Sequence, residues 1–169
     1  MGDYGMDCSP HRDRSHEECS SPVNALIVVG IDGSDTSWDA FCWACGETNR
    51  LGGRTVAVFV GPTSAAASAT ATASLVGAAA PYGAVQQSLT DLAVEICGQV
   101  RAYGQDHDAE VAFVHTQGDP ARELLRIAKA YRADLLVVGR STKARHHIAG
   151  SLGRRLVGRR GAPIVVVVP

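Results

Sequence analysis

The chain has 169 residues, of which 46% are hydrophobic and 20% are charged, and its formal net charge is −1. This length suits one domain with a sizeable core, and the charge balance argues against a globally basic nucleic-acid binder. The longest apolar runs are far too short to cross a bilayer, and the first residues contain no apolar signal segment. We therefore expect a cytoplasmic protein with no membrane role and no specific nucleic-acid partner.

The charge is distributed unevenly along the chain. Residues 1–134 contain 9 basic and 17 acidic side chains, whereas residues 135–169 contain 7 basic side chains and no acidic one. This asymmetry indicates a local anionic partner for the C-terminal part. The alternative is that these arginines coat a solvated helix and stabilise the C-terminal end of its dipole.

Residues 1–23 are polar, and we expect them to form a flexible tail in front of one domain that spans residues 24–169. Between Cys8 and Cys19 the tail contains a C-x2-H-x4-H-x2-C pattern, a spacing that could chelate zinc. The tail lacks apolar residues that would fold around a metal. Disorder is therefore the preferred interpretation, and no metal site is predicted.

The first part of the domain alternates between strand and helix patterns. Residues 25–31, ALIVVGI, form a continuous apolar run that is typical of a strand buried on both faces. Residues 34–53 place apolar side chains at helical spacing and end in Gly-Gly, which predicts a helix terminated by glycine. Residues 54–61 predict a second strand.

Cys42 and Cys45 form a C-x-x-C pair inside this first predicted helix. The pair lies in the middle of the helix rather than at its start, and no proline follows it. Thiols packed in the core are therefore favoured over a redox pair.

An uncharged segment rich in alanine, serine and threonine spans residues 62–83, and its composition predicts a mobile insert. The next pattern is an amphipathic helix over residues 84–107. The remaining predicted elements are a strand at 109–118, a helix at 119–133 with Asp119 as its N-cap and Pro120 at its first position, a strand at 134–139, a short helix at 150–161 and a strand at 163–169. This alternation predicts a parallel sheet with helices on both faces, in which ligands bind beyond the carboxyl ends of the strands.

The loop VVGRSTKARHHIAGS, residues 137–151, suits the binding of an anion. Gly139 ends a predicted strand, and Gly150 and Ser151 open a predicted helix, whose N-terminal N–H groups attract phosphate. Lys143 and its basic neighbours add donors between them. The alternative is ordinary turn chemistry with no ligand.

Asp32 comes just after the first predicted strand, where its carboxylate could accept hydrogen bonds from ribose hydroxyls. The alternative is an Asx turn or a cap for the helix that begins near Asp35.

Taken together, these segments resemble the universal stress protein family over residues 25–169. The resemblance rests on ALIVVGIDGSDTSWDA, on the insert after the second strand, on GDPARELLRIAKAYRADLLVVG and on GSLGRRLVGRRGAPIVVVVP. It implies an α/β fold, a flavodoxin-like doubly wound parallel sheet of five strands in the order 3-2-1-4-5. It also implies a homodimer formed through the last strand, at 163–169, which would otherwise be an exposed apolar edge.

One branch of this family binds ATP, and the resemblance carries its site onto this chain as a site for ATP or another adenine nucleotide. It implies that Asp32 binds the ribose, that the backbone of Val60 contacts the adenine, and that Gly139 belongs to the phosphate loop. Gly150 and Ser151 would contact the phosphates.

The chain departs from the family pattern in that loop. ATP-binding members carry G-x-x-G, nine further residues and then G-[ST]. Here Thr142 replaces the second glycine, and only seven residues separate it from Gly150. A β-branched residue is unfavourable where φ is positive or a phosphate approaches closely. Lys143 and the basic residues beside it could compensate by direct contact with phosphate.

The sequence supports three functional hypotheses. The preferred one is a nucleotide-responsive regulatory protein of the stress response, which needs no catalytic residues. The second is a nucleotide-free interaction protein of the same fold, whose basic 140–160 face docks an unidentified acidic protein partner. The third is an adenylating enzyme, because DGSDTS partly matches the loop of ATP pyrophosphatases. Nothing else in the chain supports that chemistry, so we do not expect an enzyme.

Overall fold

The first strand of the computed structural model is fully embedded in a parallel sheet, as its continuous apolar run predicts. The structure describes residues 24–63, 82–140, 152–157 and 163–169. Its five strands are β1 (Leu26–Gly30), β2 (Arg54–Gly61), β3 (Val111–Gln117), β4 (Leu135–Gly139) and β5 (Ile164–Val168). They pair in the order β3-β2-β1-β4-β5, and every pairing is parallel. The predicted α/β, doubly wound, flavodoxin-like fold and its strand order are thus confirmed.

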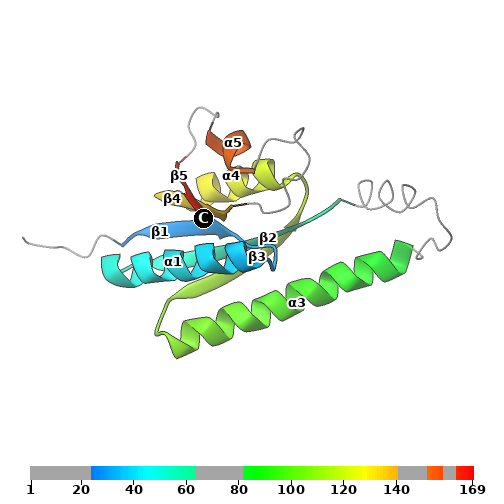
Figure 1. Cartoon of the computed structure of the whole chain (residues 1–169), viewed down its shortest axis with the longest axis horizontal. Coiled ribbons are helices and arrows are strands. Elements are labelled where there is room, and N and C mark those ends of the chain that lie inside the picture. Colours follow the sequence, from blue (N-terminus) through cyan, green and yellow to red (C-terminus); the bar gives the residue numbers. More distant parts are fainter. Residues whose placement is uncertain (1–23, 64–81, 141–151, 158–162) are drawn as a thin grey trace, which may run out of the picture.

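The helices cover the sheet on both faces (Figure 1). They are α1 (Asp35–Leu51), α3 (Tyr82–Asp106), α4 (Pro120–Tyr131) and α5 (Leu152–Val157). One apolar core cluster joins the sheet to α1 and α3, and a second joins it to α4 and α5. The three central residues of β1 are completely buried because their side chains alternate between the two clusters: Ile27 and Val29 join the first, and Val28 joins the second.

The helix ends follow local signals in the sequence. Ser34 is the N-cap of α1 and accepts a hydrogen bond from the Ser37 N–H, and Gly52 ends the helix in the left-handed conformation with φ of 66°. Asp119 caps α4 by accepting from the Arg122 N–H at 3.0 Å, with Pro120 in the first helical position, as predicted. These caps satisfy backbone groups that the first and last helical turns leave without partners.

The cysteine pair of α1 lies at the edge of the core. Cys45 is buried and Cys42 is half-buried, and both are free thiols. Burial raises the pKa of the Cys45 thiol to about 11, and the hydroxyl of Thr55 opposes this shift by a hydrogen bond. A thiol in this environment is a poor nucleophile, which fits the expected structural role of Cys45.

Several expectations concern segments outside the described residues. The N-terminal tail at 1–23 and residues 64–81 of the predicted insert are among them. The helix after the insert begins at Tyr82, two residues earlier than its sequence pattern indicates. In the part of the chain that is described, no helix is long and apolar enough to span a membrane.

Candidate functional site

The strand order reverses between β1 and β4, and this reversal creates a position for a ligand. The chain leaves β1 toward α1 on one face of the sheet, whereas it leaves β4 toward α5 on the opposite face (Figure 1). Outside the carboxyl ends of two such strands the connections diverge, and a crevice can form. Asp32 follows β1 at this edge, and Gly139 is the last residue of β4.

Asp32 is exposed and shapes the loop between β1 and α1. Its Oδ1 accepts hydrogen bonds from the Ser34 N–H at 3.0 Å and from the Ser34 hydroxyl at 2.6 Å. Between them, Gly33 has φ of 82°, which disfavours a residue with a Cβ. This is the Asx turn that the sequence offered as an alternative role for Asp32, and Ser34 rather than Asp32 caps the helix. The turn holds the Asp32 carboxylate at the edge where the strand order reverses.

Val60 lies near the carboxyl end of β2, beyond the last residue that pairs with β1. The β1 ladder ends with Gly30 opposite Val58, whose carbonyl accepts from the Ile31 N–H at 2.9 Å. Because backbone groups repeat their direction every two residues along a strand, the N–H and C=O of Val60 also face the β1 side. The Val60 side chain instead packs half-buried on the cluster under α4. The geometry therefore suits the predicted contact of Val60 through its backbone.

Gly139 is held against the first turn of α1. A Cβ at this residue would overlap the backbone of Thr36 and Ser37. The glycine thus lets β4 and the N-terminus of α1 approach closely, a role that the sequence pattern did not predict. The first turn of α1 carries the positive end of the helix dipole, so this contact brings it to the edge where β4 ends.

The remaining predicted site residues, Thr142, Lys143, Gly150 and Ser151, lie outside the described residues. Of the predicted set, the structure brings Asp32, Val60 and Gly139 to one edge of the sheet, at the carboxyl ends of the three adjacent strands β1, β2 and β4. Ser34 and Thr36 were missed as parts of this edge. The polar run Ser-Asp-Thr-Ser after Gly33 is the signal that could have identified them.

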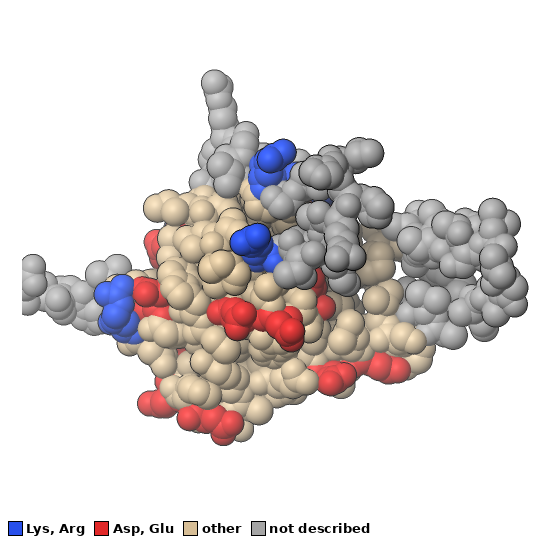
Figure 2. All heavy atoms as spheres, viewed as in Figure 1, with Lys and Arg blue, Asp and Glu red and all other residues tan. Residues whose placement is uncertain are grey.

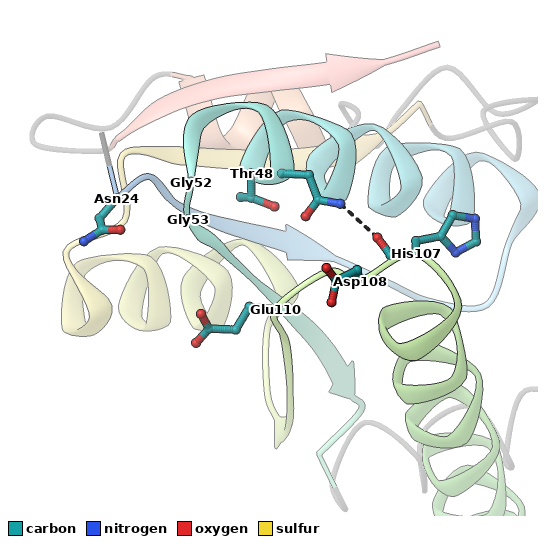
Figure 3. Close-up of a pocket in the computed structure, with 8 residues that line it drawn as sticks. Asn24, Thr48, Gly52, Gly53, His107, Asp108 and Glu110 are labelled. Carbon is teal, nitrogen blue, oxygen red and sulfur yellow. Dashed lines mark hydrogen bonds between the residues drawn. The ribbon is translucent and has the colours of Figure 1, made fainter. Parts of the chain in front are cut away.

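A cavity of about 560 Å³ lies at the opposite edge of the sheet, where the strands begin (Figure 3). Its lining includes Asn24, Gly53, His107, Asp108 and Glu110. Helices α1 and α3 end beside this cavity, and the negative ends of their dipoles add to the negative charge of Asp108 and Glu110. An anionic ligand is disfavoured at this edge, whereas the helix dipoles have the opposite sign at the edge with Asp32 and Gly139, where α1 and α4 begin.

The charged side chains are also segregated in space. On the face shown in Figure 2, acidic side chains spread over α1 and α3, whereas basic side chains gather on the side of α5, with another basic group at the far end of α1. Arg155 of α5 forms an ion pair with the N-cap residue Asp119 at 2.7 Å and thereby links α5 to α4. No three His, Cys, Asp or Glu side chains gather to form a metal site within the described ranges.

The family model of the universal stress protein family matches residues 25–168, almost the whole predicted domain. The chain belongs to the universal stress protein family. Among curated protein sequences, none matches the chain.

Solved universal stress proteins share the fold of this one. The universal stress protein UspA from Lactobacillus plantarum is similar at 22% identity and a TM-score of 0.65, over 86% of this chain and 98% of that one. A protein from Archaeoglobus fulgidus in complex with dAMP is 16% identical, with a TM-score of 0.56 over 87% and 99% of the two chains. A protein from Arabidopsis thaliana with AMP bound is 15% identical, with a TM-score of 0.57 over 85% and 90%.

Proposed function

We propose that this universal stress protein is a regulatory protein of the stress response that binds an adenine nucleotide. The observation that carries the proposal is the arrangement of Asp32, the Val60 backbone and Gly139 at the edge where the strand order reverses. The relatives from Archaeoglobus fulgidus and Arabidopsis thaliana, which hold dAMP and AMP, support the choice of an adenine nucleotide.

Each group in the proposed site has a distinct physical role. The Asp32 carboxylate accepts hydrogen bonds from the ribose hydroxyls, while its turn with Ser34 keeps it in place. The β1-facing N–H and C=O of Val60 match the donor and acceptor edge of adenine. Residues 139–151, including Thr142, Lys143, Gly150 and Ser151, contact the phosphates, with Lys143 supplying positive charge in a loop that lacks the second family glycine.

We propose that the protein forms a homodimer through β5. This strand forms one edge of the sheet, and two of its apolar side chains, Ile164 and Val167, are 69% and 46% exposed. An exposed apolar edge strand is a ready template for pairing, and pairing with a second copy would cover it.

Nucleotide extraction tests the proposed function directly. The protein is purified without added ligand and denatured, and the released small molecules are identified by mass spectrometry. Isothermal titration with AMP and ATP then measures affinity. We expect an adenine nucleotide to be released or bound, and to raise the melting temperature, because a ligand at 100 times its Kd stabilises the folded state by about 2.7 kcal/mol.

The opposite result has a defined meaning. If denaturation releases no nucleotide, and saturating AMP and ATP produce neither heat nor a shift in melting temperature, the nucleotide proposal is wrong. The nucleotide-free alternative, in which the basic 140–160 face docks an acidic protein, would then replace it.

A further inference from the structure

The proposed site leaves His115 unused, although it is an exposed aromatic side chain near the same edge. His115 lies on β3, where it pairs with Phe59 of β2. The two rings are in tilted contact, with centroids 5.4 Å apart and an interplanar angle of 49°. Phe59 is buried in the core, so it supports one side of an imidazole that is exposed to solvent.

Gly61 leaves the outer edge of this imidazole accessible. If Gly61 carried a Cβ, that atom would touch the His115 Nε2 at 3.5 Å. The missing side chain therefore exposes a ring nitrogen beside the carboxyl end of β2. Gly61 directly follows Val60, the residue proposed to contact adenine.

His115 and the loop that carries Asp32 flank β2 on the same face of the sheet. Neighbouring residues in register on parallel strands point to one face, so His115 lies on the α3 side together with Phe59. Ile31, the residue before Asp32, packs in that same core cluster. Gly33 lies close to the α3 side chains Leu92 and Ile96, which places the Asp32 turn under the same helix.

We propose that His115 is a base-contacting residue of the nucleotide site, with its imidazole packed against the purine ring. This inference rests on the proposed function. A planar imidazole already supported by Phe59 offers an ordered surface to a flat base, and stacking of this kind accepts any base by its π-face. The stacking supplies affinity for the base, whereas the Val60 backbone provides selectivity for adenine by hydrogen bonds to its edge.

The test is titration of AMP into the wild-type protein and into three variants, with the melting temperature of each recorded. His115→Ala removes the ring, and we expect it to weaken AMP binding about tenfold, the loss typical of one base stack. His115→Phe keeps a flat ring and should retain wild-type affinity within about twofold. His107→Ala is the matched control, because His107 is also exposed and stacked on an aromatic ring, Tyr103, but at the opposite edge of the sheet.

Each outcome of these titrations either supports or contradicts the contact between His115 and the base. Weaker binding by His115→Ala, with recovery in His115→Phe and no change in His107→Ala, supports the inference. If the wild-type protein binds AMP and His115→Ala binds it equally well, His115 does not contact the base, and the proposed function stands without it. If His115→Phe binds as weakly as His115→Ala, ring packing is not the interaction. If the wild-type protein binds neither AMP nor ATP, the proposed function fails and this inference falls with it.

Discussion

Gly139 and Thr36 are in direct backbone contact, so a Cβ on residue 139 would occupy the space of the Thr36 carbonyl. This contact joins the end of β4 to the first turn of α1, at the edge of the sheet where the proposed site lies. It gives Gly139 a packing role that is independent of any ligand.

We expect Gly139→Ala to destabilise the protein by about 1–3 kcal/mol, the usual cost of overpacking, because backbone cannot move aside as a flexible side chain can. Urea unfolding measures the change. The matched control is Gly46→Ala in the exposed interior of α1, where a Cβ would meet nothing within 4 Å. That change should stabilise the protein by about 0.5–1 kcal/mol, because glycine is a poor helix former. Equal stabilities for the two variants would contradict the close approach at Gly139.

Asp32→Asn tests the proposed ligand contact of Asp32 while keeping the turn that this residue forms with Ser34. Asparagine keeps an oxygen that accepts from Ser34, so the free energy of unfolding should change by less than about 0.5 kcal/mol. It loses the negative charge and one acceptor, so the affinity for AMP should fall about tenfold or more. Titration calorimetry checks the affinity, and unchanged binding would show that Asp32 serves the turn alone.

Ser34→Ala should have the complementary effect. This change removes the hydroxyl that accepts from the Ser37 N–H and donates to Asp32. We expect a loss of about 1 kcal/mol in the free energy of unfolding, the usual cost of losing a helix N-cap. Gln105→Ala, on an exposed part of α3, provides the surface comparison. A Ser34 variant as stable as that control would argue against the cap.

The buried thiol of Cys45 predicts a loss of stability at alkaline pH. Burial raises its pKa from 9.0 to about 11 in the folded protein, so the folded state retains a proton that the unfolded chain releases. The contribution of the protonated Cys45 thiol to the free energy of unfolding is therefore complete below pH 9, and it is lost as the pH rises through 11. Burial also raises the pKa of Tyr103, to about 12, which acts in the same direction.

Urea unfolding at several pH values above neutrality should show this decline, and Cys45→Ala should make it shallower. The comparison between variant and wild type isolates the thiol from other groups that titrate in this range. A variant whose stability falls with pH as steeply as the wild-type protein would contradict the assignment to Cys45.

Ile164→Lys tests the proposed dimer through β5. A lysine at this exposed edge position disfavours strand pairing, and we expect it to shift the protein toward monomer in sedimentation experiments. Val94→Lys on α3 is closely matched, because Val94 is 68% exposed and Ile164 is 69% exposed. If both variants sediment as the wild-type protein does, assembly does not use this strand edge.

Much of the fold could be predicted from sequence because its signals are local. The apolar run of β1, the Asp119-Pro120 start of α4 and the glycine at the end of α1 each involve residues close together in the chain. Helix caps depend on hydrogen bonds between residues three or four positions apart, and burial of β1 on both faces shows as unbroken hydrophobicity. The start of α3 at Tyr82 was missed because its first residues lie in a low-complexity segment without a cap signal.

The candidate site could be predicted only in part from the sequence. The sequence by itself indicated Asp32 and Gly139 through their places at the ends of apolar runs, and the resemblance added Val60 to the same site. Only the tertiary structure decided that Gly139 meets Thr36 and that His115 lies beside Gly61. The physical reason is that strand register and helix-to-strand packing join residues tens of positions apart, and no local pattern in the chain encodes which of them touch.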